Sequence, residues 1–193
     1  MEQKDALSLF RRAGAYLEGH FRLSSGLHST AYMQSALVLA TPGDAEGLGR
    51  AIAAQVKGLG ATVVLSPALG GIIIGHEVAR ALGVRSIFAE RSAPPTPTLS
   101  LRRGFALTPE DRVLVVEDVF TTGGSTRETM EVARAAGAQV VGAAAIVDRS
   151  GGTLDFGVPH KTLIAMSIPA YEPAECPLCK DGVPVMKPGS RPS

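Results

Sequence analysis

The sequence predicts an α/β domain in which a central, mostly parallel sheet is flanked by helices. Apolar segments of strand length alternate with segments of helix length along most of the chain. The strand-like segments are continuously apolar, as in TVVLS at 62–66. Continuous apolar strands are typical of a parallel sheet that is covered on both faces. The length of 193 residues favours a single domain.

The composition excludes several classes of protein. Hydrophobic residues make up 45% of the chain, which is enough for a packed core. The formal net charge is +1, so no overall field indicates a nucleic-acid or membrane partner. The apolar runs are far shorter than the about 18 residues of a membrane span, and the N-terminal segment has no apolar core of a signal peptide. We expect a cytoplasmic protein that binds neither nucleic acid nor a membrane.

The N-terminal third predicts two helices around a turn-rich stretch. Residues 4–17 carry apolar side chains at helical spacing. Residues 19–34 mix turn signals with short strand-like pieces. Thr41 is a plausible N-cap, with Pro42 in the first turn of a helix that runs to about residue 57.

The rest of the chain alternates between strands and helices. Gly83 and Gly137 are expected to end the two later helices. The expected strands are 62–66, 85–89, 112–116, 139–147 and 162–167, and the expected helices are 70–82 and 125–136.

Two segments break the alternation. Residues 92–105 are Pro-rich and then basic, and they predict a mobile loop leading into a short hairpin. The tail from Tyr171 is rich in proline and predicts an irregular wrap on the surface.

The motif EDVFTTGGST, at 117–126, has the properties of a phosphate site. It follows an apolar strand and opens a helix, and ligands of an open parallel sheet bind beyond the carboxyl ends of its strands. Small residues expose backbone amides, and the start of a helix carries partial positive charge. There is no Walker A motif, and the Gly-x-Gly at 58–60 precedes its strand, which is the wrong order for a dinucleotide fold.

The two acids of this motif require a different partner. A phosphate would repel Glu117 and Asp118, whereas the diol of a ribose offers donors to carboxylates. A Mg²⁺ ion on the ligand is also compatible with them. The alternative is a solvated strand end followed by a plain turn.

Five segments carry a resemblance to a known family. EDVFTTGGST resembles the 5-phosphoribosyl-pyrophosphate (PRPP) signature of type I phosphoribosyltransferases. FRLSSGLHSTAYMQ resembles the hood segment of their orotate branch, and LSPALGGIIIG resembles the pyrophosphate loop. IVDRSGG and the tail ECPLC…KPGSRP resemble one bacterial group within that branch.

The resemblance implies a fold and an activity. The fold is the type I phosphoribosyltransferase fold, with residues 1–193 as one domain, a core at about 41–159, and a small hood from 1–40 and about 160–193. The implied reaction is Mg²⁺-dependent transfer of ribose 5-phosphate from PRPP to orotate, with release of pyrophosphate, in pyrimidine (UMP) biosynthesis. The family also implies a homodimer with shared active sites.

The resemblance also assigns roles to residues. Glu117 and Asp118 would bind the ribose hydroxyls, and Gly70 and Gly71 the pyrophosphate. The 5-phosphate would be held by Thr122, Gly123, Gly124, Ser125 and Thr126. The base would meet Tyr32, Met33, Thr121 and Arg149. Alternatives remain for two of them: Arg149 as a structural ion pair and Tyr32 as a half-buried core aromatic.

Three arginines flank the Pro-rich loop. Arg91, Arg102 and Arg103 are expected to meet the pyrophosphate and, with Asp118, to form the catalytic set; the alternative is a solvated hairpin. Better-known members carry lysines where this chain has Ser24, Gly70 and Ser92. Their charge would be replaced by Mg²⁺ or by other basic residues, with Arg22 and His28 as further candidates.

No metal held by side chains alone is expected, because Mg²⁺ would arrive with PRPP. Cys176 and Cys179 form a single CxxC, and a structural zinc normally takes four ligands. His160 is the best third ligand that the sequence offers, and a Cys₄ site across a dimer is the alternative. The histidines have no metal-binding spacing, so reduced thiols are the favoured interpretation.

Two other functions remain open. One is a purine or xanthine phosphoribosyltransferase, against which Arg149 and the hood segment argue. The other is a PRPP-binding regulator of the same fold that binds nucleic acid, against which the near-neutral charge argues.

Overall fold

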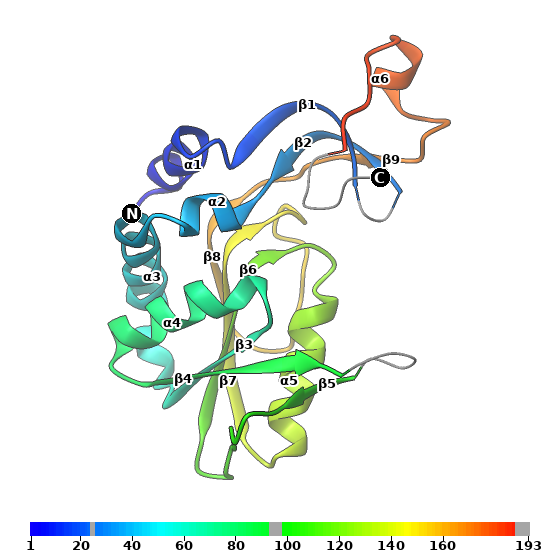
Figure 1. Ribbon diagram of the computed structural model, residues 1–193. Coiled ribbons are helices and arrows are strands. Elements are labelled where there is room, and N and C mark those ends of the chain that lie inside the picture. Colours follow the sequence, from blue (N-terminus) through cyan, green and yellow to red (C-terminus); the bar gives the residue numbers. More distant parts are fainter. Residues whose placement is uncertain (24–25, 93–97, 188–193) are drawn as a thin grey trace.

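The computed structural model describes residues 1–23, 26–92 and 98–187 (Figure 1). Three parts of the expectations above lie outside these ranges: Ser24, the prolines at 93–97 and the last residues of the tail.

The described core is a mostly parallel sheet, as predicted. Its strand order is β5-β4-β3-β6-β7-β8, and all neighbours are parallel except β4 and β5. The strands are β3 (Val63–Pro67), β4 (Arg85–Arg91), β5 (Leu99–Leu101), β6 (Arg112–Phe120), β7 (Gln139–Asp148) and β8 (His160–Ala165).

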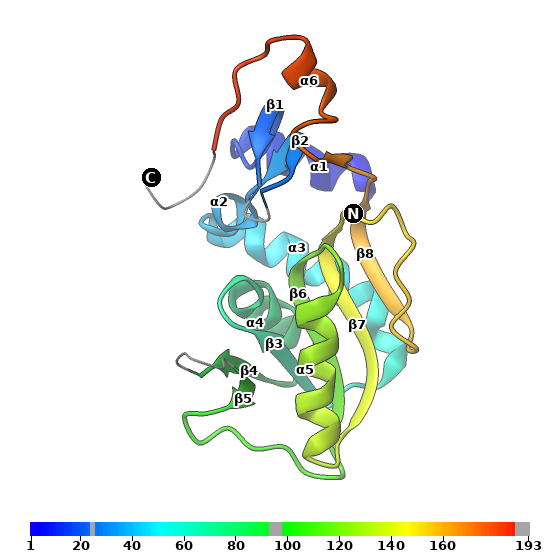
Figure 2. The ribbon, with the colours of Figure 1, turned by 90° about the vertical axis from the view of Figure 1, so that its right-hand side faces the viewer.

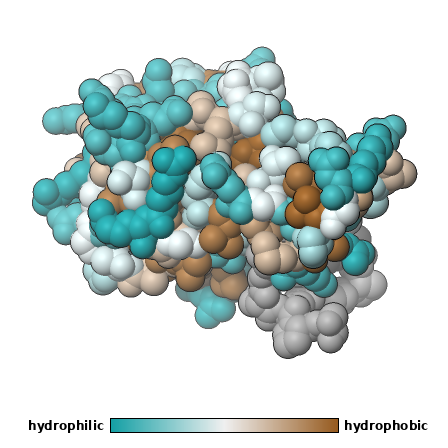
Figure 3. All heavy atoms as spheres, turned by 90° about the horizontal axis from the view of Figure 1, so that it is seen from above, coloured by the Kyte–Doolittle hydropathy of each residue, from teal (hydrophilic) through white to brown (hydrophobic). Residues whose placement is uncertain are grey.

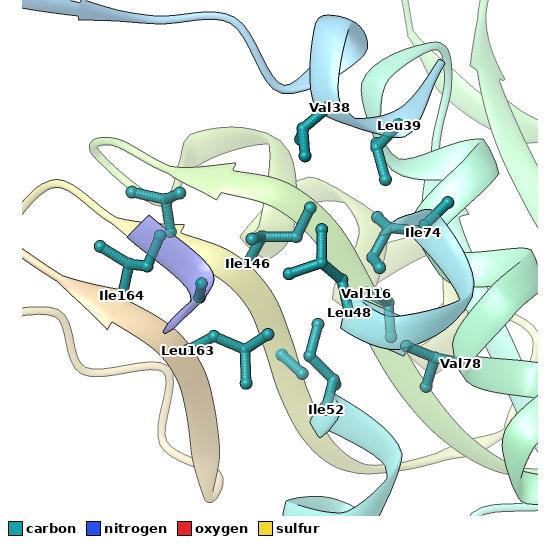
Figure 4. Close-up of a cluster of buried hydrophobic side chains, with 14 of the residues drawn as sticks. Val38, Leu39, Leu48, Ile52, Ile74, Val78, Val116, Ile146, Leu163 and Ile164 are labelled. Carbon is teal, nitrogen blue, oxygen red and sulfur yellow. The ribbon is translucent and has the colours of Figure 1, made fainter. Parts of the chain in front are cut away.

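Helices cover both faces of this sheet (Figures 1 and 2). Helices α3 (Pro42–Val56) and α4 (Gly70–Leu82) pack on one face, and α5 (Gly124–Ala135) packs on the other. A short 3₁₀ helix, η1 (Lys57–Leu59), follows α3. Residues that alternate along each strand therefore pack into two different clusters. The cluster under α3 and α4 contains Val64, Leu114 and Ile146, of which Figure 4 shows Ile146. The cluster under α5 contains Val63, Val113 and Ala145. This two-sided burial is the physical reason for the continuous apolar strands.

Glycines end the helices where the sequence predicted. Gly83 is the C-cap of α4 with φ of 73°, and Gly137, just beyond α5, has φ of 81°. Both lie in the left-handed region, which glycine enters without a Cβ penalty. Thr41 precedes α3 with an extended backbone, but its side chain makes no capping hydrogen bond.

The hood lies above the end of the sheet at which β6 leads into α5 (Figure 2). It contains an antiparallel sheet of order β1-β2-β9. Its elements are α1 (Gln3–Arg12), β1 (Tyr16–Arg22), β2 (His28–Met33), α2 (Ser35–Leu39), β9 (Ala170–Tyr171) and α6 (Pro177–Lys180). Since β8 pairs with β7 in the large sheet, the C-terminal contribution to the hood follows Ala165 rather than starting at about 160.

Two predicted boundaries differ from the structure by four or five residues. The first helix ends at Arg12 rather than at residue 17, because Gly14 turns the chain with φ of 64° and Leu17 pairs with Tyr32 in the hood sheet. The strand predicted at 112–116 continues to Phe120, because β6 stays paired with β7 up to Asp148. No separate hairpin follows the Pro-rich segment in the described chain. Instead β5, after that segment, pairs antiparallel with β4, before it.

The surface on the hood side is mainly hydrophilic, and its hydrophobic side chains form separate groups (Figure 3). Within the described ranges, no helix has both the length and the apolarity required to traverse a bilayer.

Gly49 provides a test of the packing between α3 and α4. A Cβ at this position would lie 2.5 Å from the Cβ of Glu77 and 2.8 Å from its carbonyl carbon. We expect Gly49→Ala to destabilise the protein by about 1–3 kcal/mol through overpacking, measured by chemical denaturation. Gly43→Ala is the matched control, because Gly43 lies in the same helix with open space around it. Equal stability of the two variants would contradict this packing.

Candidate active site

The site lies at the topological switch point of the sheet, where the connections between strands change the side to which they run. Strands β3 and β6 are parallel neighbours, but β3 leads through α4 to β4 on one side and β6 leads through α5 to β7 on the other. The two loops that leave their carboxyl ends therefore flank one crevice, which is the usual ligand position in an open α/β sheet.

The loop after β6 is shaped by Gly123. This residue is the N-cap of α5 with φ of 78°, and a Cβ on it would lie 2.8 Å from Cε1 of Phe156. Thr121, Thr122 and Gly124 are exposed beside it. The first turn of α5 therefore presents backbone N–H groups to solvent, which is the arrangement that binds a phosphate.

Thr126 is placed differently from the other hydroxyl residues of this loop. Its side chain is buried, and Oγ1 donates a hydrogen bond of 2.6 Å to Oε2 of Glu117. The hydroxyl thus orients a carboxylate and is not free to bind an anion.

Glu117 and Asp118 lie inside the last part of β6 rather than beyond it. Burial raises the pKa of Glu117 to about 7. The negative charge of Asp118 also raises this pKa, whereas the hydrogen bond from Thr126 lowers it. Burial also raises the pKa of Asp118. Both carboxylates are partly desolvated, and ligand hydroxyl donors would stabilise their charged forms.

The turn after β3 touches these acids. A Cβ on Gly70 would lie 2.6 Å from Oδ1 of Asp118, and a Cβ on Gly71 would lie 2.9 Å from the carbonyl oxygen of Val116. The N-terminus of α4 therefore approaches β6 closely, and any side chain at position 70, lysine included, would displace the Asp118 carboxylate.

Arg149 follows β7 beside the same edge. Its backbone N–H donates to the carbonyl of Phe120 at 2.9 Å, which places it next to Thr121. Burial lowers the pKa of its guanidinium, and Tyr32 of the hood interacts with it electrostatically. Among the described residues Arg149 forms no ion pair, and its buried Nε has no hydrogen-bond partner.

Asp148, the acid next to Arg149 in the sequence, binds backbone N–H groups rather than the arginine. The carboxylate of Asp148 accepts hydrogen bonds from the backbone of Ser150 at 2.7 Å and of Gly152 at 3.0 Å. The structural ion pair considered for Arg149 is therefore not found in the described part of the chain.

The comparisons with known proteins agree on one family. The phosphoribosyl transferase domain model matches residues 41–158. An orotate phosphoribosyltransferase of Pelotomaculum thermopropionicum is 52% identical over 191 residues, which is 99% of each chain. Another from Heliobacterium modesticaldum is 52% identical over 193 residues, covering 99% of this chain and 100% of the relative.

The chain belongs to the orotate phosphoribosyltransferase family.

The fold of this orotate phosphoribosyltransferase family member is also found among solved structures. An orotate phosphoribosyltransferase of Mycobacterium tuberculosis has a TM-score of 0.68 at 24% identity, covering 84% of this chain and 95% of that chain. An adenine phosphoribosyltransferase of Thermoanaerobacter pseudethanolicus has a TM-score of 0.60 at 18% identity, covering 69% and 87%. These likenesses show the type I phosphoribosyltransferase fold, as the sequence predicted.

The two hood residues expected at the base differ in accessibility. The side chain of Met33 packs in the core, so only its backbone is available to a base. Tyr32 is half-buried, lies 5.9 Å from the ring of Phe21 and accepts a hydrogen bond of 3.4 Å from Gln34.

The three loop arginines of this family member differ in their contacts. Arg91 pairs with Glu128 at 2.6 Å, and Arg103 binds Glu90 through two hydrogen bonds of 2.6 and 2.8 Å. Arg102 is exposed and takes part in none of the ion pairs found between described residues.

The sequence missed one cluster of chemically active side chains. His20 and His28 of the hood lie beside the two tail cysteines. His160, the expected third ligand, packs instead against the rings of Phe156 and Phe120. His28 is accordingly placed in this cluster and is not a candidate cation for the pyrophosphate. Only a fold that joins the two ends of the chain reveals this grouping.

The raised pKa of Glu117 predicts a pH-dependent cost to stability. Between the usual glutamate value and about 7, the folded protein holds this proton more tightly than the unfolded chain, so stability falls as pH rises through that window. We expect Glu117→Gln to be more stable than wild type at about pH 8, by on the order of 1–3 kcal/mol, with the difference vanishing near about pH 4. Thermal unfolding without ligands measures it.

Glu110→Gln, at an exposed position, is the matched control and should be neutral at both pH values. If Glu117→Gln is more stable than wild type by the same amount at both pH values, packing and not ionisation is responsible for the stability difference.

Proposed function

We propose that this chain transfers ribose 5-phosphate from PRPP to a ring nitrogen of orotate, in cytoplasmic pyrimidine biosynthesis. The observation that carries the proposal is Arg149, a half-buried cation without an anionic partner in the described structure, beside Tyr32 and Thr121 at the end of the sheet. A pyrimidine that bears a carboxylate supplies the missing anion. The planar guanidinium can bind that carboxylate through two parallel hydrogen bonds.

PRPP would span the two loops of the crevice. The backbone amides at the start of α5, from Thr122 to Thr126, would hold the 5-phosphate. Glu117 and Asp118 would accept hydrogen bonds from the ribose hydroxyls. Their carboxylates would also stabilise the positive charge that develops at the anomeric carbon as its bond to pyrophosphate breaks and its bond to the base nitrogen forms.

The pyrophosphate would leave along the Gly70-Gly71 turn at the N-terminus of α4. Because Gly70 contacts Asp118, the acids and the pyrophosphate turn adjoin each other. Carboxylate oxygens suit a hard cation, so Glu117 and Asp118 fit a Mg²⁺ ion that PRPP brings with it. The ion would neutralise charge on the pyrophosphate.

Arg149→Ala tests the base assignment. We expect the KM for orotate to rise about 10–100-fold, as loss of a charged hydrogen-bonded contact implies, with a much smaller change in the KM for PRPP. Orotate consumption followed by ultraviolet absorbance, with PRPP and Mg²⁺, is the measurement. Arg50→Ala, on the exposed side of α3, is the control.

Parallel assays with hypoxanthine, xanthine and uracil separate the alternatives. Turnover of a purine but not of orotate would overturn the base assignment and leave the PRPP site intact. PRPP binding without turnover of any base would favour a regulator.

We further propose a homodimer in which the β4–β5 hairpin of one subunit completes the site of the other. Arg91 and Arg103 are held by ion pairs at the surface, which solvent screens and which therefore contribute little to stability. A pyrophosphate can therefore replace Glu128 and Glu90 as their partner at little cost.

Subunit mixing tests the shared site. We expect Asp118→Asn and the double variant Arg102→Ala/Arg103→Ala to be nearly inactive alone. Co-expressed in equal amounts, they should recover about one quarter of wild-type activity, because half of the dimers are mixed and each mixed dimer has one intact site. No recovery in dimers verified by mass would place the arginines in their own subunit's site.

A further inference from the structure

Four side chains from opposite ends of the chain meet in the hood. His20 comes from β1, His28 from β2, and Cys176 and Cys179 from the start of α6. One potential ligand atom from each lies within 4.8 Å of all the others. Three of these residues are buried, and only Cys179 is exposed. Figure 1 shows the C-terminal segment with α6 beside the β1–β2 hairpin.

The distances approach those of a tetrahedral metal site. Typical Zn–S and Zn–N bonds place neighbouring ligand atoms about 3.3–3.8 Å apart. The Sγ of Cys179 lies 3.2 Å from Nδ1 of His28 and 3.7 Å from Nε2 of His20, and the Sγ of Cys176 lies 3.5 Å from Nε2 of His20. The two histidine nitrogens are 2.8 Å apart and would separate by roughly half an ångström around an ion.

A second contact orients His20 toward this centre. Its Nδ1 lies 2.7 Å from the carbonyl oxygen of Val183, to which it can only donate. The proton is therefore on Nδ1, and the lone pair of Nε2 points at His28 and the cysteines. Histidine ligands of metals are commonly fixed in this way by a carbonyl on the other ring nitrogen.

The tail that carries the cysteines has almost no apolar core of its own. Between Glu172 and Lys187, Cys176 is the only buried side chain. Backbone hydrogen bonds between Met186 and the carbonyl of His20, and between Arg22 and the carbonyl of Met186, hold its far end. Hydrophobic burial therefore does not explain why the tail folds onto the hairpin, whereas a bound metal would.

We propose that His20, His28, Cys176 and Cys179 bind one structural Zn²⁺ ion that joins the C-terminal tail to the N-terminal hairpin of the hood. Two thiolates and two imidazoles in tetrahedral geometry favour zinc among the common metals. Because four protein ligands fill the coordination sphere, the ion is structural and no position is left for a substrate.

The metal content of the untagged protein, purified without chelators or added metal, is the first test. We expect about one zinc per chain by elemental analysis, and almost none in the double variant Cys176→Ser/Cys179→Ser. His76→Gln, at an exposed position away from the cluster, should keep its zinc. Wild-type protein without zinc, or with iron instead, would overturn the proposal.

Cobalt substitution of the wild-type protein keeps the test independent of how the variants fold. Tetrahedral Co²⁺ with two thiolates should give intense visible bands and thiolate charge-transfer bands in the near ultraviolet. It should also protect the tail from limited proteolysis, as zinc does, and chelation should remove that protection. Metal bound without thiolate bands would place it elsewhere and overturn the assignment.

Discussion

The pairing of β3 with β6 is the constraint on which the rest of this structure depends. From these two parallel strands the chain departs in opposite directions, so the first turns of α4 and α5 open onto one crevice. The close approach of Gly70 to Asp118 shows how tightly the two halves meet there. A side chain at Gly70 would displace the Asp118 carboxylate, and one at Gly71 would press against the backbone of β6 at Val116.

The electrostatics of the crevice follow from this packing. Two acids at the end of β6 are partly desolvated, and a single arginine at the end of β7 is half-buried without a partner in the described structure. Partly desolvated charge of both signs at one sheet edge costs stability in the free protein. A ligand with hydroxyl donors, phosphates and a carboxylate complements each of these groups.

The hood is a small substructure that has little apolar surface of its own to stabilise it. Its small sheet contains strands from both ends of the chain, and its tail contributes little apolar surface. A sheet of this size needs additional stabilisation. Packing on the core supplies part of it, and the proposed zinc at the cluster of histidines and cysteines would supply more. The same hood brings Tyr32 close enough to Arg149 for the two to interact electrostatically.

The sequence by itself determined the α/β class, the parallel sheet, the ends of α4 and α5 and the turn that opens α5, because continuous apolar strands, glycine caps and EDVFTTGGST are local signals. Tertiary structure decided what depends on contacts between distant segments. It extended β6 through the acids by pairing with β7, ended α1 early in favour of the hood sheet, and showed Arg149 without an ionic partner among the described residues. It also brought His20 and His28 to Cys176 and Cys179 across about 150 residues, a grouping that no spacing along the chain can predict.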